Sequence, residues 1–216
     1  MLNENKITLK ICGKKTFSAH TLVKISLLSA IGFILTLPMF RWSLPIFPGF
    51  LSMDFSDMPA LIGAVVLGPI PAVWIMAIKN IMDVVLTGSS SAGIGPLANF
   101  MVGTAYVFPL GFVYHRMNRS NKALVAGAAV GTATATVIAS LLNLTILIPA
   151  YAFVLDIPID VIVGMGNAIN PAITNVLTLV IFSIVPFNIF KFGLVSIAGV
   201  IFYKAFKPAL AYMGRL

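Results

Sequence analysis

A long uncharged stretch that ends in a lysine constrains this chain more than any other feature. No charged side chain occurs between Asp160 and Lys191, and several other uncharged runs are also long. Each exceeds the roughly 20 residues that a helix needs to cross a bilayer. Charged residues make up 9% of the 216 residues, whereas soluble domains carry about 25%. We therefore predict an all-α integral membrane protein that crosses the cell membrane several times.

Basic residues gather in the tails and in one loop, and their placement predicts the orientation of the bundle. The N-terminal tail 1–21 is rich in lysine, and a second basic loop begins at His115. Basic loops beside spans stay in the cytoplasm. The net charge of +8 therefore orients a membrane protein and does not indicate a nucleic-acid surface. The first apolar run, about 22–40, lacks the small-residue cleavage site of a signal peptide, so we interpret it as an uncleaved span.

Residues 58–87 are too long for a single span and contain the break Gly68-Pro69-Ile70-Pro71. Proline disfavours the helical conformation in the residue before it. We therefore predict two short helices that meet at an inner turn. A single long helix would place the basic loop after His115 outside, against the positive-inside rule. Later spans are predicted at about 96–114 and 123–155.

The apolar C-terminal region, 161–206, is again too long for one span. Two spans would leave the basic C-terminal tail outside, so we predict one span at about 186–206. The segment 168–184 is then expected near the outer surface or as a partial helix. Under this prediction Asn188 and Lys191 lie in the first turns of the last span, close to the outer face.

These predictions combine into one membrane domain without internal repeats. Six transmembrane helices occupy residues 22–206, and both termini are cytoplasmic, with tails at 1–21 and 207–216. The single cysteine, Cys12, lies in the N-terminal tail, so disulfides play no part.

The chain lacks the residue clusters of an enzyme or an ATPase. Glu4 is the only glutamate, and no His-Glu-x-x-His or Cys-His cluster is present to hold a metal. The glycine-rich phosphate loop of ATPases is absent too. We predict a protein that is not an enzyme and holds no metal or cofactor. Any uphill transport must then draw its energy from another subunit or from an ion.

Two polar groups in the predicted spans have competing interpretations. Lys79 and Asp83 are four residues apart on one helix, so they can pair. A structural ion pair is favoured over an ion or proton relay, because charges inside membranes often pair with one another. Asn143 continues a stripe of small residues at every fourth position. It contributes either a hydrogen bond between helices or a contact to a ligand, and the stripe favours neither.

Three polar side chains are predicted to meet under one aromatic loop. Lys191 follows Asn188 by three residues on the same helical face, and Asn143 is expected at a similar depth. Lys191 could instead extend its amine toward the surface. Convergent polar groups in an apolar cavity are, however, the usual pattern of a small-molecule site. Phe47 and Phe50, set among prolines and a glycine, suit a lid over such a site.

Several short segments, taken together, form a specific pattern that runs in order from about residue 22 to 206. They are Phe47–Gly63, Leu67–Pro69, Ile78–Asn80, Gly95–Asn99, Leu142–Leu144 and Pro186–Lys191. This pattern resembles the riboflavin-specific S components of energy-coupling factor (ECF) vitamin transporters of the bacterial plasma membrane.

The resemblance implies a six-helix protein that binds its vitamin near the outer face. It implies that Asn143, Asn188 and Lys191 contact the flavin ring, while the loop around Phe50 and Leu51 closes over it. The predicted ligand-binding residues also include one from the segment Gly95–Asn99, which is Asn99.

The resemblance also implies partner subunits. Two small residues four apart on the first helix dock on a transmembrane coupling subunit in that family, and two ATPase subunits supply the energy. The family usually has alanine at both positions, whereas this chain has Ser26 and Ala30. Serine is still small enough for close helix packing.

The resulting prediction is a riboflavin-binding subunit of an ATP-driven importer. One alternative is an S component for another vitamin. A second is a secondary transporter driven by ions, with Lys79 and Asp83 as its relay.

Overall fold

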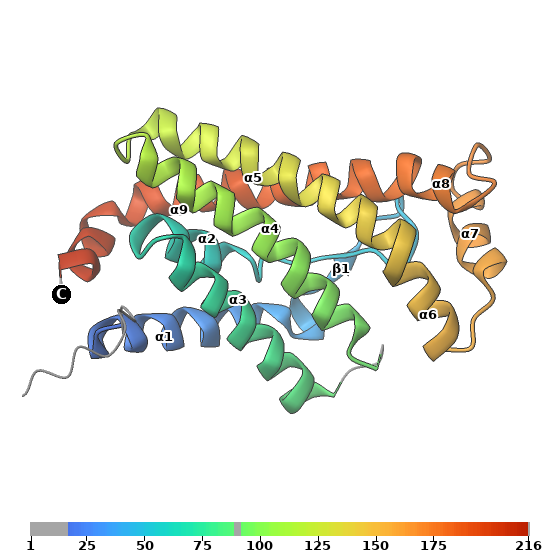
Figure 1. The fold of residues 1–216 in the computed structure, drawn as a ribbon, viewed down its shortest axis with the longest axis horizontal. Helices are drawn as coiled ribbons and strands as arrows, with labels where there is room; N and C mark the ends of the chain where they lie inside the picture. The colour runs from blue at the N-terminus through green and yellow to red at the C-terminus, as the bar shows by residue number, and fades with distance from the viewer. Residues whose placement is uncertain (1–16, 89–91, 216) are drawn as a thin grey trace, which may run out of the picture.

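The computed structural model describes residues 17–88 and 92–215, and most of them are helical (Figure 1). The predicted cytoplasmic tail 1–21 therefore lies mostly outside the described residues, as does most of the predicted outer loop 88–91. The long helices run side by side along the length of the molecule.

Within residues 17–88 and 92–215, five helical stretches are long and apolar enough to cross a membrane. The first is α1, and the second joins α3 to a short π-helical turn, η2. The third is α4, and the fourth runs through α5, the π-helical turn η3 and α6. The bounds are Ala19–Thr36 for α1, Pro69–Met82 and Asp83–Thr87 for α3 and η2, Ile94–Arg116 for α4, and Asn121–Leu142, Asn143–Leu147 and Ile148–Val154 for α5, η3 and α6.

The predicted break near Gly68 is confirmed. Helix α2, Met58–Val66, ends just before Gly68, whose φ of 110° suits only glycine, and α3 begins at Pro69. The nine residues of α2 extend over about 14 Å, less than half of the hydrocarbon thickness. Helix α2 therefore lies in the membrane bundle without being long enough to cross it alone.

The predicted start of the last span is wrong. The fifth stretch begins at Val176 and continues without interruption, so residues 176–184 belong to it and are not a separate partial helix. A π-helical turn precedes Pro186 and loosens the backbone ladder that a proline would otherwise break. Its parts are α8 (Val176–Leu179), the π turn η4 (Val180–Ile184) and α9 (Val185–Arg215).

Two predicted site residues, Asn188 and Lys191, therefore lie further along the last span than the sequence predicted. Lys191 lies about 22 Å from the helix start at Val176, so it occupies the middle of the last span and not its first turns. Helix α7, Ile159–Asn167, precedes this span at the end of the molecule where Asp156 and Asp160 are exposed.

Close packing of α4 against α5 forms the centre of the bundle. A β-carbon at Gly127 would lie 2.7 Å from the carbonyl oxygen of Leu110, and one at Gly131 would lie 2.5 Å from that of Tyr106. Both distances are too short for any larger residue. The small-residue stripe predicted on α5 is therefore a helix-packing face.

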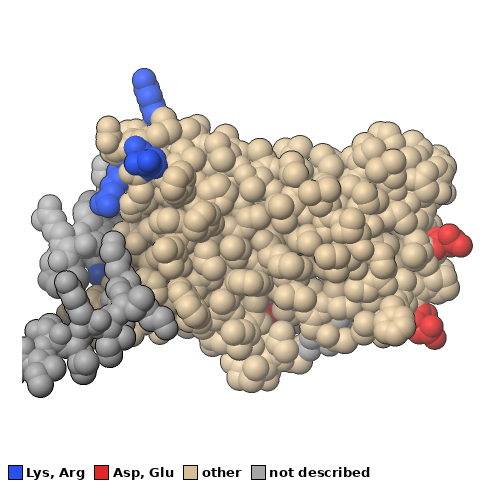
Figure 2. All heavy atoms as spheres, viewed as in Figure 1, with Lys and Arg blue, Asp and Glu red and all other residues tan. Residues whose placement is uncertain are grey.

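The ends of the molecule carry opposite charge. Figure 2 shows Lys and Arg side chains at one end and acidic side chains at the other. The exposed Arg119 and Lys122 lie in and after the turn between α4 and α5, whereas Asp156 lies between α6 and α7 and Asp160 lies in the first turn of α7. The start of α1 and the end of α9 lie at the basic end (Figure 1).

Candidate functional site

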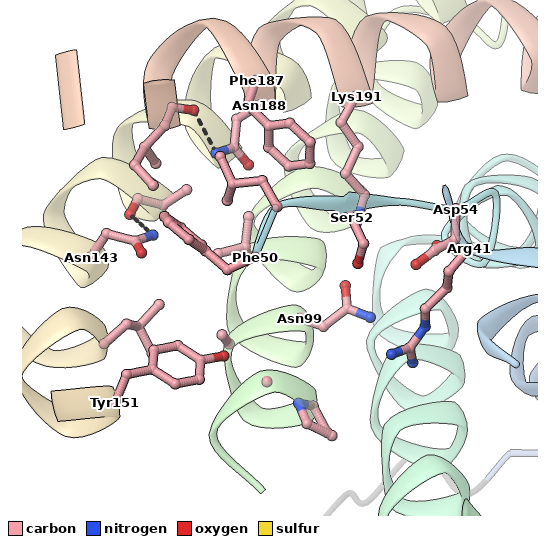
Figure 3. Close-up of a pocket in the computed structure, with 18 of the residues that line it drawn as sticks. Arg41, Phe50, Ser52, Asp54, Asn99, Asn143, Tyr151, Phe187, Asn188 and Lys191 are labelled. Carbon is pink, nitrogen blue, oxygen red and sulfur yellow. Dashed lines mark hydrogen bonds between the residues drawn. The ribbon is translucent and has the colours of Figure 1, made fainter. Parts of the chain in front are cut away.

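A cavity of about 950 Å³ opens among the ends of the helices opposite the basic turn. Its walls come from the first loop, η2, α4, the α5–α6 region, α7 and the last helix. All six residues predicted to bind a ligand line this one cavity, and most are labelled in Figure 3. They are Phe50, Leu51, Asn99, Asn143, Asn188 and Lys191. Their placement together is thus observed, and their contact with a ligand stays a prediction.

Asn143 and Asn188 present the same chemistry to the cavity. Each side-chain amide nitrogen donates to the carbonyl oxygen four residues earlier, Asn143 to Ala139 and Asn188 to Ile184, at 2.8 Å in both cases. Each amide oxygen is turned away from that bond (Figure 3). Asn143 is the first residue of the π-helical turn η3, and Asn188 bonds to Ile184, the last residue of η4. Such turns are frequent at functional sites. The cavity therefore carries two oriented hydrogen-bond acceptors.

Lys191 lines the cavity close to a buried carboxylate. Its Nζ lies 3.5 Å from Oδ2 of Asp57, and its side chain is 11% exposed. Asp57 itself is fully buried and does not line the cavity. Lys191 is therefore an ammonium donor at the cavity wall. Its positive charge is compensated by Asp57, which lies behind that wall.

The predicted ion pair between Lys79 and Asp83 is wrong. The Nζ of Lys79 donates instead to Oδ1 of Asp57 at 2.5 Å and to Oγ of Ser56 at 2.6 Å. Asp83 accepts from Arg41 at 3.1 Å. The buried lysine thus takes both of these partners from the entry to α2, and not from its own helix.

Asp54 adds a second carboxylate beside Lys191. It is buried, lines the cavity and accepts a hydrogen bond from the backbone N–H of Ser56 at 2.9 Å. Burial opposes ionisation, but the charges of Lys191 and Lys79 and the hydrogen bonds from Ser56 outweigh it and lower the pKa of the Asp54 carboxyl. The cavity wall therefore includes an acidic side chain.

The acidic and basic groups in and behind the cavity wall balance formally. Three are cations and three are carboxylates among the described residues. The cations are Arg41, Lys79 and Lys191, and the carboxylates are Asp54, Asp57 and Asp83. Because isolated charge is costly in a low-dielectric site, such a cavity favours a ligand without net charge.

A small β-hairpin carries the first loop over the cavity. Strands β1 (Trp42–Ser43) and β2 (Ser52–Met53) pair antiparallel. At the tip, Phe47 is buried and meets the ring of Phe187 edge to face, with centroids 5.3 Å apart. Phe50 is 41% exposed and lines the cavity. Phe47 thus anchors the loop on the last helix. Of the two phenylalanines, Phe50 is the one that lines the cavity.

Sequence reasoning missed several lining residues. Arg41 and Asp83 pair across the cavity wall, and Asp54 and Tyr151 also line it. Asp54 and Asp57, the two acidic residues before α2, were visible in the sequence. Only the fold shows that Asp54 faces the cavity and that Asp57 faces two lysines. Tyr151 carries no sequence signal that separates it from a core aromatic residue.

The predicted docking residues lie away from the cavity on α1. Ser26 is exposed and Ala30 is half-buried, beside the exposed Leu22, Val23 and Leu27. This apolar face of α1 is open to contact. Among residues 17–88 and 92–215, no His, Cys, Asp and Glu side chains form a group able to hold a metal.

Comparison with known proteins gives a consistent result. Residues 20–203 match the family model described as "ECF transporter, substrate-specific component". The chain is 33% identical to the riboflavin transporter FmnP of Bacillus subtilis (strain 168) over 190 residues, covering 87% of this chain and 92% of that protein. It is 30% identical to the riboflavin transporter RibU of Staphylococcus aureus (strain TCH60) over 183 residues, covering 85% and 88%. A solved structure of the S component of a bacterial ECF transporter matches with a TM-score of 0.68 at 30% identity, covering 88% of this chain and 96% of that one.

Proposed function

This chain belongs to the family of substrate-specific components of ECF transporters, and we propose that the vitamin it binds is riboflavin. It is a multi-pass membrane protein and a binding subunit, not an enzyme. Because the chain belongs to this family, we discard the alternative of an ion-driven secondary transporter. The two similar proteins named above are both riboflavin transporters, which supports the choice of vitamin.

The observation that carries the proposal is the polar group on the cavity wall. Asn143 and Asn188 offer amide oxygens, and Lys191 offers an ammonium. The pyrimidine end of isoalloxazine has an imide N–H donor between carbonyl acceptors. An imide therefore finds both acceptors and a strong donor on this wall.

The rest of the ligand also has suitable partners in the cavity. The dimethylbenzene end needs only apolar contacts, which Leu147, Ile184 and Phe187 provide. The ribityl hydroxyls need donors and acceptors, which Asn99 and Thr87 in the cavity wall provide. Riboflavin carries no net charge, in agreement with the balanced charges around the cavity.

The energy for transport comes from an ECF module, because the sequence has no phosphate-binding loop of its own. We propose that this module consists of a transmembrane coupling subunit and two ATPase subunits. The open face of α1 around Ser26 and Ala30 is the proposed docking surface. Purification of the chain from cells that express the module should recover all of these subunits together.

We further propose six membrane-inserted helices with both termini in the cytoplasm, α2 being the short one. The exposed basic residues at one end of the bundle support this orientation (Figure 2). Cys12 is the only cysteine, so it offers a direct test. A membrane-impermeant thiol reagent should label the protein only after the cells are permeabilised. Labelling of intact cells would reverse the proposed orientation.

The identity of the vitamin is tested by extraction. Protein purified in detergent without added ligand should carry a yellow compound, which mass spectrometry of the denatured extract should identify as riboflavin. Recovery of another vitamin instead would retain the family and overturn the choice of riboflavin.

A further inference from the structure

Asp57 occupies an unusual place for a residue before a helix. It is the N-cap of α2, where an aspartate normally accepts hydrogen bonds from the first turn, but its side chain makes no such bond. It is completely buried and faces two lysines from other helices. Its carboxylate therefore serves tertiary contacts and not the helix it precedes.

The two carboxylate oxygens of Asp57 have different partners. Oδ1 accepts the hydrogen bond from Lys79, whereas Oδ2 makes no hydrogen bond and lies 3.5 Å from Nζ of Lys191. Only Lys191 of these three residues lines the cavity. The contact to Lys79 thus leaves one oxygen directed at the cavity lysine.

The bundle encloses the carboxylate, because the side chains of Asp57 and Lys79 are both fully buried. Two neighbouring helices approach this pair at glycines. A β-carbon on Gly103 of α4 would lie 3.4 Å from Oδ1 of Asp57, and one on Gly32 of α1 would lie 3.3 Å from Cδ of Lys79. Fixed partners behind a ligand-contacting group fix the direction of that group.

We propose that Asp57 is a positioning residue for ligand binding, which, held by Lys79, fixes the ammonium of Lys191 at the cavity wall. The effect on riboflavin binding rests on the proposed function, whereas the arrangement of Asp57, Lys79 and Lys191 does not. Lys79 and Lys191 are then coupled through one carboxylate, although only one of them faces the ligand.

A ligand-independent experiment tests the arrangement first. In protein labelled with ¹⁵N-lysine, the Nζ signal of Lys191 is assigned by its loss in Lys191→Met. It should shift and broaden in Asp57→Asn, because the ammonium loses its ion pair with Asp57. Ser56→Ala is the matched control, since it removes a bond to Lys79 but keeps both ion pairs, and it should leave the signal in place. An unchanged Lys191 signal in Asp57→Asn overturns the proposal, whatever ligand the protein binds.

A double-mutant cycle then tests the effect on affinity. Asp57→Asn should weaken riboflavin binding about tenfold or more, but less than about twofold when Lys191 is already methionine. Equal losses in both backgrounds would show that Asp57 acts without Lys191 and would overturn the proposal. If Asp57→Asn does not fold, Lys79→Met combined with Asp57→Asn keeps the buried charge balanced, and the same loss is expected. Wild-type affinity in that variant would also overturn it. If the wild-type protein does not bind riboflavin, the proposed function is refuted but the proposed role of Asp57 is not, because the ¹⁵N experiment uses no ligand.

Discussion

Lys79 forms its ion pair with Asp57, 22 residues earlier in the chain, and not with Asp83 on its own helix. Both side chains are fully buried. The contact ties α3 to the entry of α2 and places a carboxylate directly behind the cavity wall. It therefore connects the packing of the bundle to the candidate binding site.

Removing one partner of this pair should destabilise the protein strongly. Lys79→Ala leaves the Asp57 carboxylate with the longer contact to Lys191 alone, and breaking a buried pair in this way costs about 3–5 kcal/mol. A thermal-denaturation series in detergent measures the loss. Adding Asp57→Asn to Lys79→Met should recover part of it, because no unpaired charge then stays buried. A Lys79→Ala protein as stable as wild type would contradict this account of the pair.

Lys191→Ala should weaken riboflavin binding about ten- to hundredfold. It removes a charged donor from the cavity wall, and such a hydrogen bond is worth about 1.5–3 kcal/mol. Asn188→Ala should cost less, because its amide is neutral. Isothermal titration of both variants, with melting temperatures recorded alongside, checks the order. The reverse order, at unchanged stability, would place the flavin ring elsewhere in the cavity.

A bulky side chain on the outer face of α1 should separate binding from transport. Ala30→Trp should abolish uptake in cells while riboflavin binding in detergent is retained, because it blocks close helix approach. Ser26→Trp should do the same and is the cleaner variant, since Ser26 is exposed. Val137→Trp is the matched control on an exposed position of α5. Uptake by the isolated wild-type chain in liposomes, without an ATPase, would rule out the docking model.

The glycines of α5 that face α4 should be far less tolerant of substitution than a helical glycine with open space beside it. Gly131→Ala places a β-carbon 2.5 Å from the carbonyl oxygen of Tyr106, and such overpacking costs about 1–3 kcal/mol. Gly193→Ala on α9 meets no atom within 4 Å and should be neutral or slightly stabilising. Melting temperatures of the two variants provide the comparison. Equal effects would mean that α4 and α5 are not packed as described.

The sequence was sufficient for the features that depend on local pattern. The break at Gly68, the small-residue face of α5 and the meeting of Asn143, Asn188 and Lys191 were all predicted. The first two follow from helical periodicity and from the conformational preferences of glycine and proline, which neighbouring residues determine. The meeting of Asn143 with Asn188 and Lys191 also required the predicted topology and the family resemblance.

Two predictions failed because distant or compensating structure decided the outcome. The partner of Lys79 comes from a loop that only the fold brings near, so spacing along its own helix was misleading. Pro186 suggested a helix start, but the π-helical turn before it allows the helix to pass through. Asp54 and Asp83 in the cavity wall were missed because only the fold brings their segments to the cavity.

The most direct test of the central claim is a fluorescence titration of the detergent-purified, ligand-free protein with riboflavin. The account predicts saturation at one riboflavin per chain, with quenching of the flavin as its ring packs beside Phe187 and Phe50, and no competition from thiamine or biotin. Failure to bind riboflavin, together with binding of thiamine or biotin in the same preparation, would contradict it.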